Sequence, residues 1–244
     1  DDYSTFEDYN YTLAGVVVAA SNEAPTGSVT IAGTATEDEI LTASNNIADG
    51  DGIDSSGISY QWNRDGTAIS GATSSTYTLV QADVGSTITV TAAYTDGQNT
   101  AESSTSSATG AIANVNDDPT GSVTITGTAQ EDQVLGIATS QIADEDGLGT
   151  FSYQWNRAGT AVSGATSLIY TLGQDDVGSA MTVTVSYTDG QGTAESVTSG
   201  ATSAVSNIND AATVAISGTA TEDQVLTATV TDEDGTSGTI TYAW

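Results

Sequence analysis

Tyr60-Gln61-Trp62-Asn63-Arg64 returns unchanged as Tyr153-Gln154-Trp155-Asn156-Arg157, 93 positions further along the chain. The stretch Pro25 to Ile31, PTGSVTI, returns as Pro119 to Ile125, and a third copy starts near Thr221-Glu222-Asp223, which matches Thr36-Glu37-Asp38. A repeat of about 90 residues is too long for a solenoid unit and has the size of a self-contained domain. The sequence therefore predicts a string of similar domains.

These repeats set the expected domain boundaries. Residues 22–115 form a first module, residues 116–208 a second, and residues 209–244 the start of an incomplete third. Residues 1–21 match no complete repeat, although Leu13 to Ala20 could align with a last strand. Two interpretations of this segment stay open: it is the end of a preceding module, or it is a donor-like strand that pairs with a neighbouring subunit.

Each module reads as an all-β unit. Met181-Thr182-Val183-Thr184-Val185-Ser186-Tyr187 alternates apolar and polar residues, which is typical of a half-buried strand. Asp65-Gly66 between two short β-rich runs predicts a hairpin. In the first module we expect strands at residues 28–33, 40–45, 57–63, 67–69, 76–79, 87–94 and 100–113. Short strands at this spacing predict a β-sandwich.

Three placements in each repeat resemble bacterial immunoglobulin-like modules. Trp62 resembles the buried strand-C tryptophan of such sandwiches, and Tyr77-Thr78-Leu79, Asp83-Val84-Gly85 and Ile88-Thr89-Val90 resemble the corner between strands E and F. The resemblance covers about residues 22–244 and matches tandem modules of very large secreted bacterial surface proteins, including repetitive adhesins. It implies tandem Ig-like β-sandwich domains in an elongated array at the bacterial cell surface or in the extracellular space.

The module boundaries carry a second resemblance. Asn114-Val115-Asn116-Asp117-Asp118-Pro119 and Asn207-Ile208-Asn209-Asp210 are similar to the calcium-binding linkers of cadherin-type domains. Residues 22–25 are a weaker copy, and the third copy departs from the pattern with Ala212 in place of proline. The resemblance implies calcium between successive modules.

Composition removes several classes of function. The chain has 32 acidic residues against two arginines, no lysine, no histidine and no cysteine, for a formal charge of −30. Such a charge repels nucleic acid and anionic lipid, and no run of residues is long and apolar enough for membrane insertion. Imidazole, thiolate and lysine chemistry is excluded. Carboxylate, amide and hydroxyl oxygens remain, and these are the ligands that calcium prefers.

The acidic residues recur at equivalent positions, and a calcium site needs several of them to converge. We expect each junction to gather the linker acids, the Glu-Asp pair after the first strand and a loop from the end of the preceding module. For the second junction these are Asn116, Asp117, Glu131, Asp132 and Asp96. The full set of candidate ligands is Glu23, Glu37, Asp38, Asp49, Asp51, Asp54, Asp96, Asn116, Asp117, Asp118, Glu131, Asp132, Asp144, Glu145, Asp146, Asp189, Asn209, Asp210, Glu222, Asp223, Asp232 and Asp234.

A simpler interpretation is that these acids are solvated turn formers, because Asp and Gly favour turns for local backbone reasons. Their clustering at repeated positions favours a cation, since packed like charges repel without one. Paired carboxylates could also serve a glycosidase, but such a site needs two acids across a cleft. Acids that recur in every module within glycine-rich turns do not fit that requirement, so we expect no enzyme.

The remaining candidates have structural explanations. Arg64 and Arg157 could contact an anionic ligand, but a local ion pair with a nearby Asp or stacking on an aromatic ring is favoured. Trp62, Trp155 and Trp244 are expected in cores rather than on a sugar-binding surface. The sequence thus predicts a structural or adhesive segment of a long surface or fibre protein, with neighbouring copies of itself as candidate partners. A glycan-binding module and a non-catalytic spacer of a secreted hydrolase are the alternatives.

Overall fold

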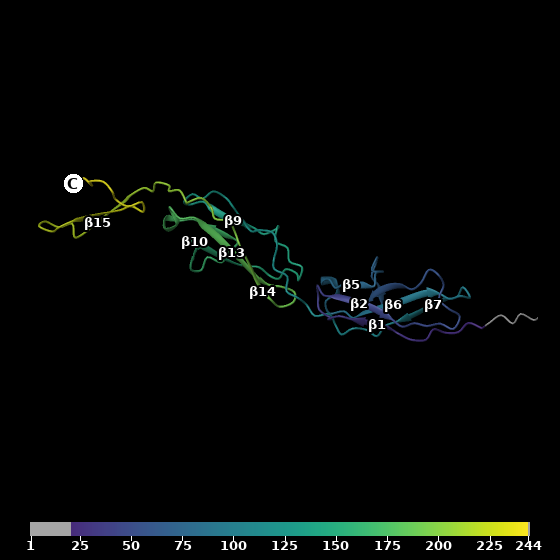
Figure 1. Cartoon of the computed structure of the whole chain (residues 1–244). Helices are drawn as coiled ribbons and strands as arrows, with labels where there is room; N and C mark the ends of the chain where they lie inside the picture. The colour runs from purple at the N-terminus through teal and green to yellow at the C-terminus, as the bar shows by residue number, and fades with distance from the viewer. Residues whose placement is uncertain (1–20, 244) are drawn as a thin grey trace, which may run out of the picture. The chain divides into compact units, whose positions relative to one another are not determined.

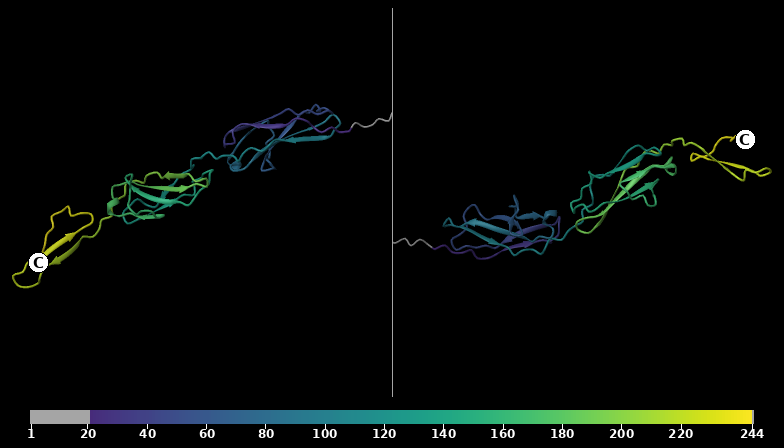
Figure 2. Two further views of the ribbon diagram at one scale, coloured as in Figure 1. Left: turned by 90° about the horizontal axis from the view of Figure 1, so that it is seen from below. Right: turned by 180° about the vertical axis from the view of Figure 1, so that it is seen from behind.

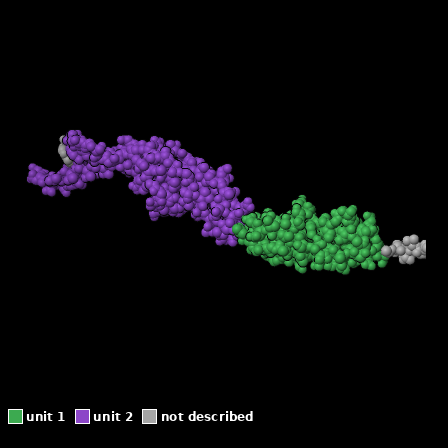
Figure 3. Space-filling model, viewed as in Figure 1, with its two compact units in different colours: residues 1–115 green, residues 116–244 purple. Residues whose placement is uncertain are grey.

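The computed structural model describes residues 21–243, and the chain divides into two compact units, residues 1–115 and 116–244 (Figure 3). The predictions for residues 1–20 and for Trp244 lie outside the described residues. In the part of the chain that is described, no helix is long and apolar enough to cross a membrane.

Unit 1 contains two antiparallel sheets (Figure 1). The first has the order β1-β2-β5 and consists of β1 (Val29–Ala32), β2 (Ile40–Asn45) and β5 (Thr76–Thr78). The second has the order β4-β3-β6-β7 and consists of β4 (Thr67–Ala68), β3 (Ser59–Arg64), β6 (Ile88–Thr95) and β7 (Ala101–Thr105). Strands β1 and β6, from different sheets, contact each other, so the sheets pack as two layers.

Unit 2 repeats this arrangement (Figure 2). One sheet has the order β12-β9-β8, from β12 (Ile169–Thr171), β9 (Val134–Ala138) and β8 (Thr124–Thr126). The other has the order β11-β10-β13-β14, from β11 (Thr160–Ala161), β10 (Ser152–Arg157), β13 (Met181–Thr188) and β14 (Ala194–Thr198). The third copy of the repeat adds the hairpin β15 (Thr213–Ser217) and β16 (Thr227–Thr231).

The strand order is that of an immunoglobulin-type sandwich. Strands β1, β2 and β5 take the places of A, B and E, and β4, β3, β6 and β7 take those of C′, C, F and G. The register is also repeated: Trp62 lies opposite Val90, and Trp155 lies opposite Val183. The prediction of an all-β fold made of tandem Ig-like sandwiches is confirmed.

A tryptophan lies at the centre of each sandwich. The side chains of Trp62 and Trp155 are fully buried and stack on Tyr77 and Tyr170, with ring centroids 5.7 and 5.6 Å apart. The indole N–H of Trp62 donates to the carbonyl oxygen of Ser74 at 2.9 Å, so the one polar atom of the ring is satisfied. The expectation that these tryptophans belong to cores is confirmed.

Each arginine forms an ion pair at the corner that follows β5 in unit 1 and β12 in unit 2. Arg64 Nε donates to the buried carboxylate of Asp83 at 2.7 Å, and that carboxylate also accepts from the Tyr77 hydroxyl at 2.9 Å. The corner itself is a short 3₁₀ turn, η1 (Gln81–Asp83), which recurs as η2 (Gln174–Asp176). Arg157 and Asp176 repeat the ion pair at 2.6 Å. The local ion pair predicted for both arginines is confirmed.

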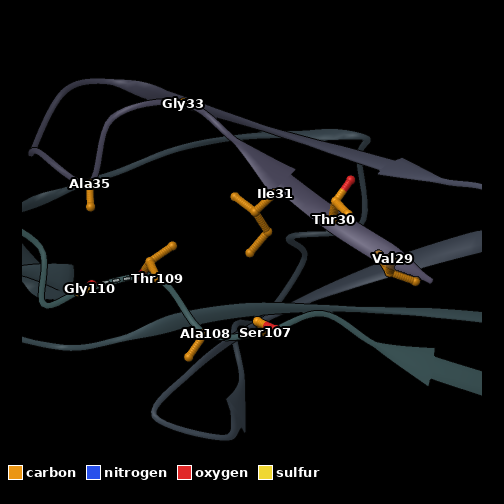
Figure 4. A pocket seen from close by; sticks show the side chains of 9 residues that line it. All are labelled: Val29, Thr30, Ile31, Gly33, Ala35, Ser107, Ala108, Thr109 and Gly110. Carbon is orange, nitrogen blue, oxygen red and sulfur yellow. Dashed lines mark hydrogen bonds between the residues drawn. The ribbon is translucent and has the colours of Figure 1, made fainter.

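The last strand of unit 1 is shorter than predicted. It ends at Thr105 rather than at Ala113, because side-chain hydroxyls replace ladder bonds beyond it: Ser106 Oγ accepts from Val90 N at 3.0 Å and Thr109 Oγ1 from Ile88 N at 3.0 Å. A shallow hollow of about 350 Å³ lies between this irregular segment and β1 (Figure 4). Uncharged residues line the hollow, and none of the predicted ligands is among them.

The buried tryptophans lead to a stability prediction. Trp155→Ala should lower the free energy of unfolding of unit 2 by about 3–5 kcal/mol, because it leaves a large cavity and removes the stacking on Tyr170. Urea unfolding followed by circular dichroism measures the loss. Gln133→Ala, at an exposed position in the same unit, is the control and should change stability by less than about 0.5 kcal/mol. Equal losses in the two variants would contradict the assignment of Trp155 to the core.

Candidate metal centre

An acidic loop follows β2 in unit 1, and hydrogen bonds fix its first two carboxylates. Asp49 accepts from the Asp51 amide at 2.9 Å and from the Tyr94 hydroxyl at 2.5 Å. Asp51 accepts from the Glu23 amide at 2.6 Å and from the side-chain amide of Gln98. The loop therefore connects the chain that enters the unit with the end of β6.

Asp96 follows β6, and the backbone around it contacts the same acidic loop. The amide of Gly97 donates to the Asp51 carbonyl at 3.2 Å, and a Cβ atom at Gly97 would lie only 2.3 Å from that oxygen. Only glycine permits this approach. Asp96 is 2% exposed, and its Oδ1 accepts from the amides of Gln98 and Thr100 at 2.9 and 2.6 Å. Its Oδ2 is shielded from water without a hydrogen-bond partner among residues 21–243.

Unit 2 builds the same arrangement from equivalent residues. Asp144 accepts from the Asp146 amide at 2.9 Å and from the Tyr187 hydroxyl at 2.5 Å, and Asp146 accepts from the Asp117 amide at 2.9 Å. Asp189, 7% exposed, takes the place of Asp96: three amides donate to its Oδ1 at 2.6–2.9 Å. Its buried Oδ2 has no hydrogen-bond partner in the described part of the chain.

The third acidic loop joins a carboxylate from the body of unit 2. One oxygen each of Glu131, Asp210 and Asp234 lies within 4.8 Å of the others. Glu131 is 2% exposed and accepts from the Ile208 amide at 3.0 Å, and Asp234 Oδ2 accepts from the Asp210 amide at 2.6 Å. Asp234 Oδ1 is shielded from water, and no described residue donates a hydrogen bond to it. This group spans the linker 207–210.

The acidic loops raise the pKa values of two nearby tyrosines. Burial, the hydrogen bond to Asp49 and the charges of Asp49, Glu102 and Asp96 together raise the pKa of Tyr94 far above its ordinary value. Burial and the equivalent residues Asp144, Glu195 and Asp189 raise the pKa of Tyr187 in the same way. Each tyrosine hydroxyl therefore donates to one carboxylate and lies in the field of two others. No arginine among the described residues is hydrogen-bonded to these carboxylates.

The donor set fits a hard divalent cation. Every candidate ligand is a carboxylate or amide oxygen, and calcium takes six to eight oxygens from side chains, carbonyls and water. A buried carboxylate oxygen without a hydrogen bond is costly, and a bound ion is one of its few explanations. Three such oxygens occur among the described residues: those of Asp96 and Asp189 are at equivalent positions of units 1 and 2, and that of Asp234 lies in the third acidic loop.

The grouping expected from the sequence needs correction. Glu131 and Asp132 were expected to join Asn116 and Asp117, but Glu131 instead meets Asp210 and Asp234, while Asp117 meets Asp146. The reason is the parallel bridge between Gln130 and Ser206, which places the Glu131 carboxylate beside the linker that follows the module. Glu37 repeats this in unit 1: it is buried and accepts from the Val115 amide at 3.3 Å. Asp96, expected at the junction, lies against the acidic loop of unit 1.

The other predicted ligands lie in less distinctive places. Asp38, Asp132 and Asp223 have φ angles of 61–63° at exposed turns, which suits the interpretation as turn formers. Asp54 accepts from Ser56, whose side-chain and backbone hydrogen bonds lower the pKa of Asp54. Asp118, Glu145 and Glu222 are exposed. Asp232 accepts from the Asp234 amide at 3.0 Å, and Asn209 donates to the Asp210 carbonyl at 3.1 Å.

Two glutamates of the acidic surface were missed by sequence reasoning. Glu102 accepts from the side-chain amide of Asn22 at 2.7 Å, and Glu195 accepts from that of Asn116 at 2.9 Å. Both are partly buried and are the second residue of the last strand of their sandwich. Their repetition in Ala101-Glu102-Ser103 and Ala194-Glu195-Ser196 was a usable signal.

Comparison with known proteins finds solved structures that resemble this chain only at low similarity. No protein-family model and no curated protein match it. The three N-terminal domains of the highly immunogenic outer capsid protein (Hoc) of bacteriophage RB49 align with a TM-score of 0.27 and 15% identity, over 84% of this chain and 70% of that one. The tandem Ig repeats of Dlar align with a TM-score of 0.23 and 12% identity, over 74% and 96%.

The tyrosines predict a weakness at high pH. The unfolded chain ionises its tyrosines near pH 10, whereas Tyr94 and Tyr187 resist ionisation in the folded state, so the free energy of unfolding should fall as pH rises above about 10. In Tyr94→Phe/Tyr187→Phe this fall should be less steep. It should not vanish, because burial also raises the pKa values of Tyr77 and Tyr170.

Urea unfolding between about pH 9 and 11 in chelator, together with the tyrosinate absorbance, measures both quantities. An unchanged pH slope in the double variant would contradict the placement of the two hydroxyls among carboxylates.

Proposed function

We propose that this chain is a structural segment of an extracellular surface or fibre protein, in which calcium ions rigidify tandem Ig-like modules. The observation that carries the proposal is the repeated carboxylate oxygen that is buried without a hydrogen bond, in Asp96, Asp189 and Asp234. A single such oxygen could be incidental. Asp96 and Asp189 are at equivalent positions of the first two repeats, and Asp234 lies in the acidic loop of the third, so the requirement recurs along the chain and a bound cation would meet it.

The linker at residues 207–210 supplies the mechanical part of the proposal. It is too short to behave as a random coil, yet short polar connections still permit hinge motion. Glu131 comes from the body of unit 2, Asp210 from the linker and Asp234 from the loop after β16. A cation held by all three would tie these segments together. Without it, their mutual repulsion favours separation.

The same chemistry supports the proposal of a non-catalytic role. The acidic loops recur in each repeat, and the buried Trp62 and Trp155 offer no exposed ring on which a sugar could stack. We therefore favour a spacer or fibre segment over a glycan-binding module. A place on the bacterial cell surface remains part of this proposal and rests on the resemblance of the repeats.

Calcium should stabilise the fold by mass action. Each site should contribute about 2.7 kcal/mol when free calcium exceeds its dissociation constant a hundredfold. The full chain should therefore melt at a clearly higher temperature in millimolar calcium than in chelator. Asp189→Asn keeps an oxygen for the three amide hydrogen bonds but removes the charge, so it should lose much of the calcium-dependent increase.

Asp175→Asn is the matched control, because it removes the same charge from an exposed position of unit 2. It should keep the full response to calcium. Calorimetric titration should show binding heat for the parent and the control. Equal melting temperatures in calcium and chelator, with no binding heat, would overturn the proposed cation.

The hinge can be tested separately, because the chain has no cysteine and accepts spin labels at chosen sites. Ser196→Cys on β14 and Thr229→Cys on β16 place labels at exposed positions on the two sides of the linker 207–210. Pulsed electron resonance should give a narrow distance distribution in calcium and a broad one in chelator. With Glu131→Gln added, the distribution in calcium should stay broad. Equal widths in all conditions would mean that calcium does not fix the linker.

A further inference from the structure

Strand β12 is the end strand of the sheet β12-β9-β8, and none of the described residues pairs with its outer side. The amide of Leu172 donates to the carbonyl of Gln133, just before β9, at 3.0 Å. Because backbone groups alternate between the two sides of an antiparallel strand, Ile169 and Thr171 turn their N–H and C=O groups to the free side. The sheet thus ends in an open hydrogen-bonding edge.

The residues at this edge are unusually apolar for an exposed position. Ile169 is 61% exposed and Leu168, just before the strand, is 55% exposed. On the same outward face of the sheet, Val134 of β9 is 48% exposed and lies diagonally across from Ile169, next to the bare backbone of Gly136. Ile169 and Val134 on this face, together with Leu168 at the end of the edge, form a short apolar strip.

Unit 1 keeps an exposed apolar residue, Ile40, at the position of Val134, but it shows that the fold does not require apolar residues on the edge strand itself. Ser75 and Thr76 occupy the positions of Leu168 and Ile169, and β5 is the end strand of its sheet in the same way. The core contacts are conserved between the units, since Tyr77 and Tyr170 both stack on the tryptophan. The two repeats therefore differ in the side chains at the free edge, whereas the contacts that anchor the edge strand to the core are the same.

Exposed edge strands are usually protected by charge, proline or a bulge. Strand β12 is short, with three residues, but it has no charge, proline or bulge: its pairing with β9 is regular, and residues 158–174 contain no charged residue and no proline. A basic partner would bind the acidic loops and not this uncharged strip, because the strip has no charge to attract it. It is, however, a surface on which two chains of charge −30 can meet without opposed carboxylates.

We propose that β12 is a self-association edge, at which unit 2 pairs with unit 2 of a second copy of the chain. The strands pair antiparallel about a two-fold axis near Tyr170, so that Ile169 lies opposite Thr171 of the second copy. This joins the two three-stranded sheets into one, satisfies the open backbone groups of the edge and brings Ile169 of each copy against the other chain. The antiparallel arrangement also keeps the two Asp175 residues apart, because each lies beside the uncharged residues 164–167 of the other chain.

Sedimentation velocity of the full chain over a wide concentration range tests the proposal. The parent should show a monomer–dimer equilibrium that strengthens with added salt, because salt screens the repulsion between the two acidic chains while the contact itself is uncharged. The variant Leu168→Ser/Ile169→Thr gives β12 the residues of unit 1. It should weaken the dimer by about tenfold or more, with an unchanged melting temperature.

Two further variants distinguish pairing at this edge from non-specific hydrophobic association. Leu148→Ser removes an exposed leucine, 45% accessible, elsewhere in unit 2 and should leave the dimer intact. The reciprocal Ser75→Leu/Thr76→Ile gives unit 1 the same edge and should produce species larger than dimers. A parent that is monomeric at every concentration and salt would overturn the proposal, and so would a dimer that Leu148→Ser weakens as much as the β12 variant does.

Discussion

The packing of one tryptophan between two sheets holds each complete sandwich together. The chain has no cysteine, so no disulfide can link the sheets, and burial of apolar surface around Trp62 and Trp155 has to supply the stability. The indole N–H reaches a carbonyl on the segment before β5 or β12, and the ring stacks on the tyrosine of that strand. This contact orients the end strand of the smaller sheet, and the Arg–Asp–Tyr corner that follows secures it.

The polar features of the protein depend on that fixed core in different ways. At the corner, the buried Asp83 receives hydrogen bonds from Arg64, Tyr77 and the Val80 amide, so its charge is compensated within the unit. At the acidic loops the compensation is incomplete, because one oxygen each of Asp96 and Asp189 is buried without a donor. The contrast matters for function: the same fold satisfies one buried aspartate fully and leaves the other with capacity for a ligand.

The two complete repeats also show how one scaffold can carry different surfaces. Their cores, registers and acidic loops agree closely, whereas the outer edge of the smaller sheet is polar in unit 1 and apolar in unit 2. In a string of domains such a difference assigns separate tasks to neighbouring modules. Calcium would act on the linker, and the β12 edge would act between chains, so stiffness and assembly can vary independently.

The sequence by itself determined the repeat, the all-β class and most strands, because period-two alternation and Asp-Gly turns are local signals. It also determined the chemistry of the candidate site, since a chain without His, Cys or Lys has only oxygen ligands to offer. Which acids converge was decided by the tertiary structure. The bridge between Gln130 and Ser206 carries Glu131 to the linker that follows its module, and the close approach of Gly97 to Asp51 buries Asp96. These are long-range contacts between strands and loops, and no local pattern in the sequence encodes which partner each residue meets.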